Sequence, residues 1–402
     1  MLAKHCLPRW RAYTWLVIGS GVLLGAMWAL TSPAVAAGSL KIGFLATFSG
    51  PGGVLGKELY DGFMLGVDHA GGTLGGLTTE VLQVDDQLKP DVAKQAVERF
   101  IQKDKVHFIT GVVFSNVMMA IYKPVIEANT FLISANAGPS PIAGELCSPF
   151  FFSSSWQNDQ MHSTVGQYVQ EKGYKQVYLL APNYQAGLDA IAGFKRHYAG
   201  GIAGELYPKL GQIDFTAEIA QIRAAKPDAM FAFTPGGMGI SLVKQLAESG
   251  LIREVPFFSA FTVDHVTIPA VGEAAVGAFT PTMWGPDLPN AANTRFVADF
   301  QKKFGRMPSY YAVQGYDAAQ LIGSAVQATG GDLSNQDKLR QALQQASFAP
   351  PRGKFAFNHN HFPVQDFYMA EAVKNAAGTV DLVIRQKVFT DAVDAYHQAC
   401  KM

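Results

Sequence analysis

The chain has 402 residues, of which 49% are hydrophobic, with 32 basic and 32 acidic side chains and therefore no net formal charge. This length and composition are those of a globular protein with enough core for two or three domains. The neutral balance and the lack of any basic block argue against nucleic acid as a partner, because such binding needs a concentrated positive surface.

The first 37 residues have the pattern of an export signal. Basic residues such as Lys4 and Arg9 precede an apolar run over 15–30, and a group of small residues follows it. Small residues at that place are what a signal peptidase accepts, so we predict cleavage after Ala36 or Ala37. The alternative is an uncleaved membrane anchor, since the apolar run is near the lower length limit for spanning.

The first part of the exported chain is predicted to form a parallel α/β sheet. Residues 41–47 make a nearly apolar strand, the glycine-rich stretch 49–53 ends it, and a helix follows. Strand and helix then alternate as far as residue 134, which implies a doubly wound sheet with a ligand crevice at the carboxyl ends of its strands. The predicted strands are 41–47, 78–85, 106–113 and 130–134, and the predicted helices are 55–70, 90–103 and 116–127.

A proline-rich break at 136–150 precedes a second run of alternating elements, so two lobes are predicted. Another proline-rich passage, 281–289, is followed by three helices and then by strands joined by turns. The predicted helices are 159–173, 186–198, 215–225, 238–250, 291–304, 311–329 and 334–347, and the predicted strands are 176–181, 228–233, 256–259, 353–358, 365–373 and 381–389.

Motifs for cofactors and catalysis are missing or incomplete in the sequence. The stretch from Gly50 begins like a dinucleotide fingerprint, but Leu55 stands at its last glycine position and Asp85 follows later than the expected acidic residue. No nucleophile elbow or zinc-binding helix motif is present. His359 and His361 could form a metal pair, although a solvated turn is favoured. We therefore predict no cofactor, no metal and no enzyme activity.

Polar groups converge where two of the predicted strands end. Phe114, Ser115 and Asn116 follow one strand, and Asn136 and Ala137 follow the next. Hydroxyl, amide and backbone N–H groups at such a place suit a carboxylate, although Ser115 and Asn136 could simply cap helices and turns. Aromatic residues that belong either to this surface or to the core are Phe151, Phe152, Trp156, Tyr184, Phe261 and Trp284.

Two cysteines remain once the export signal with Cys6 is removed. Cys147 and Cys400 form a candidate disulfide in an oxidising compartment, and spacing alone leaves open the alternative of two separate buried thiols.

The mature chain resembles the periplasmic substrate-binding proteins of branched-chain amino acid type ABC transporters. The likeness rests on KIG-x-L-x-x-x-SGP from Lys41, the strand end VDD and the helix motif GYDAA at 315–319, and loops near Asn136, Trp156 and Tyr184 resemble the subgroup that binds aromatic acids. It implies a type I periplasmic binding protein fold: two doubly wound parallel-sheet lobes joined by three crossovers, with hinge closure on a ligand. Implied segments are 1–37 (signal), 38–155 (lobe 1), 156–282 (lobe 2), 283–349 (lobe 1) and 350–402 (lobe 2 with the C-terminal strands).

The resemblance also implies a periplasmic location, a small-molecule ligand and an inner-membrane ABC permease as partner. In the family, positions matching Ser115, Asn136 and Ala137 hold the ligand carboxylate, and the position of Tyr184 closes from the second lobe. The predicted ligand-binding residues are Leu55, Phe114, Ser115, Asn116, Asn136, Ala137, Trp156, Tyr184, Phe261 and Tyr311.

One departure from the family concerns the charge of the ligand. Amino acid binders carry an acidic residue for the ligand ammonium at the position that is Phe261 here. A buried ammonium without its partner is strongly disfavoured, so an aromatic or hydrophobic carboxylate is the predicted ligand. The alternative is a branched-chain amino acid or amide receptor that uses Asp264 instead, and a more remote one is an exported α/β enzyme.

Overall fold

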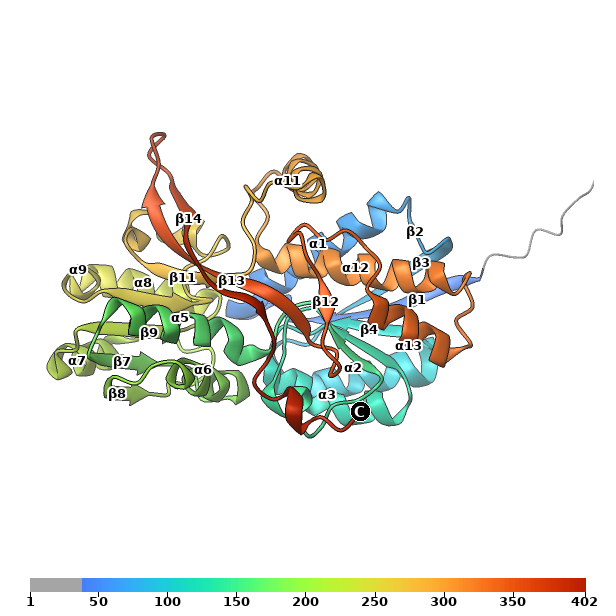
Figure 1. Cartoon of the computed structure of the whole chain (residues 1–402), viewed down its shortest axis with the longest axis horizontal. Helices are drawn as coiled ribbons and strands as arrows, with labels where there is room; N and C mark the ends of the chain where they lie inside the picture. The colour runs from blue at the N-terminus through green and yellow to red at the C-terminus, as the bar shows by residue number, and fades with distance from the viewer. Residues whose placement is uncertain (1–37) are drawn as a thin grey trace, which may run out of the picture. The chain divides into compact units, whose positions relative to one another are not determined.

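The computed structural model describes residues 38–402, and the predicted signal at 1–37 lies outside this range. Two sheets of six and eight strands each form the centre of a lobe, with helices on both faces (Figure 1). The predicted fold class, two doubly wound α/β lobes joined by three crossovers, is confirmed. None of the helices within 38–402 has the length and apolar character needed to cross a membrane.

The first sheet has the strand order β2-β3-β1-β4-β5-β6. Its strands are β1 (Ser39–Ala46), β2 (Thr73–Leu74), β3 (Leu77–Asp85), β4 (Phe108–Gly111), β5 (Phe131–Ser134) and β6 (Phe151–Ser153). The helices that accompany it are η1 (Gly50–Gly52), α1 (Gly53–His69), α2 (Pro90–Arg99), the π-helix η2 (Phe100–Asp104), α3 (Ser115–Glu127), α4 (Ser140–Ala143), α11 (Ala291–Phe304), α12 (Tyr310–Ala328) and α13 (Gln336–Gln345).

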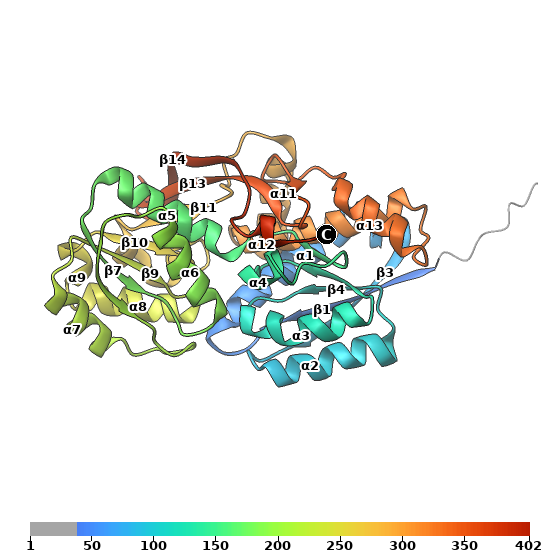
Figure 2. The same cartoon turned by 60° about the horizontal axis from the view of Figure 1, so that its bottom comes forward.

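The central strand β1 is buried on both faces because helices cover each side. It pairs in parallel with β3 and β4. Phe44 belongs to the core cluster that contains α1 and α12, whereas its neighbour Leu45 belongs to the cluster that contains α2 and α3. Figure 2 shows α1 and α12 on one side of this sheet and α2 and α3 on the other. The apolar run that predicted this strand therefore reflects its burial beneath helices on both faces of the sheet.

The second sheet combines parallel strands with an antiparallel edge. Its strands are β7 (Gln176–Leu180), β8 (Gly201–Leu206), β9 (Ala229–Phe233), β10 (Phe257–Ala260), β11 (Phe279–Thr282), β12 (Ala356–Phe357), β13 (Pro363–Lys374) and β14 (Val380–Ala392). The helices are α5 (Asn158–Lys172), α6 (Gln185–Arg196), α7 (Thr216–Ala225), α8 (Gly237–Glu248), α9 (Leu251–Glu254), α10 (Ile268–Val271), η3 (Gly272–Ala275) and η4 (His397–Ala399). The pairs β11–β13 and β13–β14 are antiparallel, and the β13–β14 hairpin projects from this edge (Figure 1).

The chain crosses between the lobes after β6, after β11 and after α13. Arg352 in the third crossover ties these segments together. Its guanidinium donates to the carbonyl oxygens of Ser154 (2.6 Å) and Ser155 (3.2 Å) in the first crossover and to a carboxylate oxygen of Asp317 on α12 (2.8 Å). All these groups are buried. The carbonyl oxygens of Ser154 and Ser155 thus accept from a charged donor. The first crossover is therefore held by hydrogen bonds as well as by apolar packing.

Four strands were not predicted from the sequence, and each lacks the usual pattern. β2 has only two residues. β6 has only three residues, and β8 carries two glycines within GIAGEL at the outer edge of the second sheet. β11 contains Pro281, which the sequence placed in a proline-rich connection. The pairing of β11 with β10 is confined to Phe279, so Pro281 lies beyond that ladder and pairs only with Met369 of β13.

The C-terminal segment contacts parts of the first lobe. Cys147 and Cys400 form a disulfide with a Cα–Cα distance of 5.6 Å. Asn360 donates to the carbonyl of Ala143 at 2.8 Å. The turn at 358–361 is present, but the expectation that it is solvated is wrong for Asn360 and His361, which are buried because this turn packs on the first lobe.

Candidate functional site

A cavity lies between the two lobes, at the carboxyl ends of strands from both sheets. Its volume is about 30 Å³ in this structure. Most of its lining side chains are buried. They are Leu55, Val113, Phe114, Ser115, Asn136, Ala137, Trp156, Asn158, His162, Tyr184, Ala186, Phe233, Pro235, Phe261 and Tyr311.

The N-terminus of α3 faces the cavity from the first lobe. Phe114 is its N-cap residue and offers no side-chain cap. The first α-helical bond runs from the N–H of Met118 to the carbonyl of Phe114 (3.0 Å), so the preceding N–H groups of the first turn have no acceptor within the helix. The Ser115 hydroxyl accepts from Asn158 Nδ2 at 3.0 Å and keeps its own proton available. These donors favour an anion at this end of the cavity.

The loop after β5 forms the neighbouring wall. Asn136 donates through Nδ2 to the carbonyl of Val113 (2.7 Å), which fixes the orientation of its amide. The backbone N–H of Ala137 donates to the carbonyl of Val112 (3.1 Å). Ala137 therefore contributes a methyl surface rather than a free donor, and the available hydrogen-bond donors at this end come from Ser115 and α3.

Aromatic rings form the rest of the cavity wall. Trp156, from the first crossover, lies against Phe261 with ring centroids 4.9 Å apart, and Phe261 lies 6.4 Å from Tyr311. Tyr184 packs beside Phe233 at 6.2 Å. Phe261 has φ +57°, an uncommon conformation for an aromatic residue that is compatible with a functional constraint on its ring. This surface fits the faces of a flat apolar ligand.

His162 is a titratable side chain of the cavity that is surrounded by apolar rings. It lies on α5 against Phe233 (4.9 Å between ring centroids) and Phe261 (5.5 Å). Burial lowers the pKa of His162 to about 3, and neither a hydrogen bond nor a nearby charge contributes to this shift. The imidazole is therefore neutral at physiological pH. Its Nδ1 atom is buried and has no hydrogen-bond partner within the described part of the chain.

Asp264 is not available to a ligand in the cavity. It is fully buried and is absent from the cavity lining. Its Oδ1 accepts from the N–H groups of Val266 and Thr267, both at 2.9 Å, and its Oδ2 accepts from the Tyr310 hydroxyl at 3.0 Å. Desolvation raises the pKa of Asp264 in spite of these bonds. Its carboxylate thus stabilises a turn, and no acidic side chain of residues 38–402 lines the cavity.

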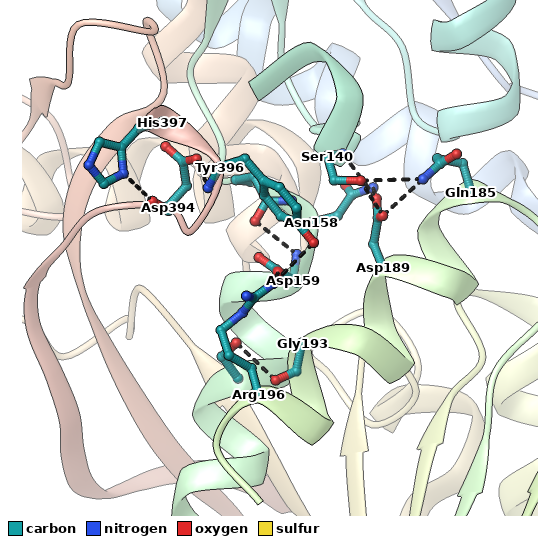
Figure 3. Close-up of polar contacts among 12 residues, drawn as sticks. Ser140, Asn158, Asp159, Gln185, Asp189, Gly193, Arg196, Asp394, Tyr396 and His397 are labelled. Atoms are coloured by element: carbon teal, nitrogen blue, oxygen red, sulfur yellow. Dashed lines mark hydrogen bonds and ion pairs between the residues drawn. The ribbon is translucent and has the colours of Figure 1, made fainter. Parts of the chain in front are cut away.

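Polar contacts join the lobes beside the cavity. Asp189 on α6 accepts from the hydroxyl of Ser140 (2.7 Å) and the backbone N–H of Ser140 (3.2 Å) on the first lobe. The same carboxylate accepts from Asn158 (2.8 Å) and Gln185 (2.9 Å), as Figure 3 shows. Asn158 also reaches Ser115, so a connected network runs from the anion-favouring end of the cavity to the junction of the lobes.

Glycines allow the lobes to approach at another point of the cavity rim. A Cβ atom added to Gly236 would lie 2.9 Å from the Pro51 carbonyl oxygen, and one added to Gly237 would lie 2.9 Å from the Pro51 Cβ. Gly236 also has φ +63°, which L side chains rarely adopt. The two lips of the cavity therefore touch in this structure, which represents a closed arrangement.

The structure brings together all predicted ligand-binding residues except Asn116, which follows Ser115 on α3 but does not line the cavity. Their part in binding stays a prediction. The sequence reasoning missed Asn158 and His162 as cavity residues. Their spacing of four at the start of a helix indicates that they share one helix face, but it does not indicate that this face lines the cavity.

A family model described as "Periplasmic binding protein" matches residues 39–378. The chain belongs to the periplasmic binding protein family. Members of this family are solute-binding receptors rather than enzymes. The exported character predicted from the first 37 residues agrees with this membership, while their cleavage stays a prediction.

Relatives of this periplasmic binding protein include a Leu/Ile/Val-binding protein homolog 6 of Brucella melitensis biotype 1. It is 26% identical over 364 residues, covering 88% of this chain and 93% of the relative. A solute-binding protein of an ABC transporter from R. palustris, solved in complex with benzoate, is 32% identical with a TM-score of 0.86, covering 91% of this chain and 100% of that one.

Another solved neighbour is a solute-binding protein of an ABC transporter from Rhodopseudomonas palustris BisB5, in complex with 3,4-dihydroxybenzoic acid. It is 30% identical with a TM-score of 0.82, covering 89% of this chain and 99% of that one. The predicted family resemblance is confirmed, including its likeness to proteins that bind aromatic acids.

Proposed function

We propose that this periplasmic binding protein is the extracytoplasmic receptor of an ABC importer and binds a single-ring aromatic carboxylate between its lobes. The observation that carries the proposal is a buried cavity with hydrogen-bond donors at one end, aromatic rings along its walls and no charged side chain among its lining residues. The proposal includes cleavage of the signal after Ala36 or Ala37, release into the periplasm and delivery of the closed complex to an inner-membrane permease.

The ligand carboxylate is placed at the N-terminus of α3, where Ser115 and the free N–H groups of the first turn are donors. Charge-assisted bonds of this kind are stronger than those between neutral groups. The ring then lies between Trp156, Tyr184 and Phe261. Solved neighbours whose ligands are benzoate and 3,4-dihydroxybenzoic acid support the same class of ligand.

An α-amino acid is a poorer candidate for this cavity. Its ammonium group would need an acceptor of opposite charge, and Phe261 occupies the position of that acid in amino acid binders. Asp264 is already engaged by two backbone N–H groups and a tyrosine hydroxyl. It could pair with an ammonium only after these bonds were broken.

Calorimetric titration of the purified mature protein with benzoate and with leucine tests the proposal. We expect benzoate to bind and leucine to give no heat of binding, with benzoate affinity about tenfold lower for Ser115→Ala because one hydrogen bond to a charged group is lost. Asp264→Asn, which alters the only acid considered for an ammonium, should leave benzoate affinity unchanged. Tight leucine binding that disappears in Asp264→Asn, with no response to benzoate, would contradict the proposal.

A further inference from the structure

His162 has hydrogen-bonding capacity inside the cavity that the protein does not use. The side chain is 1% exposed and lines the cavity, yet its Nδ1 has no partner within the described residues. A buried polar atom without a partner is unfavourable, and such atoms are uncommon in native structures. The surrounding rings of Phe231, Phe233 and Phe261 offer no hydrogen-bonding side-chain atom to it. A ligand group is therefore the natural partner for this imidazole.

The position of His162 relative to the carboxylate end follows from α5. Asn158 and His162 are four residues apart and share one face of this helix, separated by ~6 Å along its axis. Asn158 contacts Ser115 at 3.0 Å, next to the donors assigned to the ligand carboxylate. His162 lies one helical turn further, toward the second lobe. That separation is comparable to the length of a benzene ring with its substituents, so His162 is placed at the far end of a bound aromatic acid.

We infer that His162 selects aromatic carboxylates that carry a hydroxyl group on the ring, at the end away from the carboxylate; this inference rests on the proposed function. A neutral imidazole has one donor and one acceptor, and a hydroxyl group can match either ring nitrogen. A methyl or halogen substituent leaves the imidazole unpartnered. A second carboxylate or an ammonium group would lack a charged partner among the cavity residues.

The ratio of affinities for hydroxylated and plain benzoate tests this role. Wild type and His162→Leu are titrated with benzoate, 3-hydroxybenzoate and 4-hydroxybenzoate. Wild type should bind at least one hydroxybenzoate about tenfold more tightly than benzoate, as one added hydrogen bond predicts. In His162→Leu the ratio should fall to about one, because the bond that is lost is made only to the hydroxyl group. His162→Gln should restore part of the preference, because an amide keeps a donor and an acceptor.

His265→Phe is a matched control. The side chain of His265 is half-buried, its Nδ1 is buried without a partner among the described residues, and burial lowers its pKa to about 4, but it does not line the cavity. Replacement of His265 should leave the ratio of hydroxybenzoate affinity to benzoate affinity as in wild type. A ratio altered equally by His265→Phe and His162→Leu would overturn the inference, because the effect would then follow from any buried histidine.

The outcomes separate this inference from the proposed function. Absence of binding for all three acids in wild type contradicts the proposed function and with it the inference. Binding of all three with a ratio that is one in wild type, or unchanged in His162→Leu, contradicts the inference alone. An equal loss of affinity for every acid in His162→Leu also overturns the inference, since the imidazole would then hold the carboxylate.

Should the His162→Leu variant not fold, ¹⁵N NMR of the wild-type imidazole decides. The resonances of its ring nitrogens must shift with a hydroxybenzoate and not with benzoate.

Discussion

At the scale of single residues, His265 shows how the desolvation of a histidine affects the response of stability to pH. Its ring centroid lies 5.7 Å from that of Trp284, and Asp287 and Asp381 are the charged groups that act on it. Burial outweighs their attraction and lowers the pKa of His265 to about 4. In the unfolded chain the ordinary histidine value of about 6.5 applies, so between these two values the unfolded state binds more protons. The contribution of His265 to stability is thus present above pH 6.5 and lost as the pH falls.

We predict that replacing this histidine flattens the dependence of stability on pH. Between pH 7 and pH 5, the free energy of unfolding of wild type should fall by about 2 kcal/mol more than that of His265→Phe. Urea unfolding of both proteins at the two pH values measures the difference. The comparison between proteins is needed because buried carboxyls with raised pKa values, such as Asp159 at about 6, act in the opposite direction in both. Parallel curves for the two proteins would contradict the assignment.

Single residues also show which cavity positions the sequence could indicate, although their part in binding stays a prediction. Ser115, Asn136 and Tyr184 could be predicted because each follows a strand whose carboxyl end is fixed by the α/β pattern. His162 could not, because whether a helical residue faces a cavity or the core depends on how α5 docks against both lobes. An isolated histidine in a helix carries no such information.

At the scale of elements, α6 and α4 are linked by the carboxylate of Asp189. This carboxylate accepts two hydrogen bonds from Ser140 across the lobe boundary and two more from Asn158 and Gln185 (Figure 3). These cross-lobe bonds can form only when the lobes are close together, so they stabilise the closed state relative to the open one. These bonds raise the population of the closed state, and they thereby raise the affinity for a ligand that binds that state.

We predict that Asp189→Ala weakens ligand binding without touching the ligand. Affinity for the aromatic acid should fall about tenfold, since loss of the carboxylate removes both cross-lobe bonds from Ser140 and one of the bonds from Asn158. Calorimetry measures this change. Asp228→Ala serves as the control, because Asp228 accepts from the backbone N–H groups of Lys175 and Gln176 within the second lobe only. Unchanged affinity in Asp189→Ala, or equal losses in both variants, would show that this network does not govern closure.

The elements that sequence patterns identified are those with strong periodicity. The buried strand at β1 and the long helix α12 were predicted because an apolar run and a GYDAA-containing helical stretch leave few alternatives. The edge strand β8 and the proline-containing β11 were missed, because hydrogen bonds to neighbouring strands stabilise them in spite of their glycine and proline content. Tertiary pairing, which single-sequence propensity does not contain, decides such elements.

At the scale of the whole molecule, the disulfide between Cys147 and Cys400 closes a long loop. The two cysteines are 253 residues apart, so the bond restricts most of the unfolded chain. It ties the segment after η4 to the first lobe, and neither cysteine lines the cavity. Its effect should therefore concern stability and not ligand binding.

We predict that replacing both cysteines by serine lowers the free energy of unfolding by about 2–4 kcal/mol, the usual effect of a cross-link over a long loop. Urea unfolding with and without a reductant measures this. Reduction should destabilise wild type and leave the double variant unchanged, while ligand affinity stays the same in both. Equal stability of the oxidised wild type and the double variant would contradict the prediction.

The contact of Pro51 with Gly236 and Gly237 has a consequence for how a bound ligand exchanges with free ligand in solution. While these backbones are in contact, a ligand bound among buried side chains cannot be replaced by a competing ligand from solution. Dissociation must wait until Gly236 and Gly237 separate from Pro51, so the rate of ligand release depends on how often the lobes open and on the contacts that the ligand makes with both lobes.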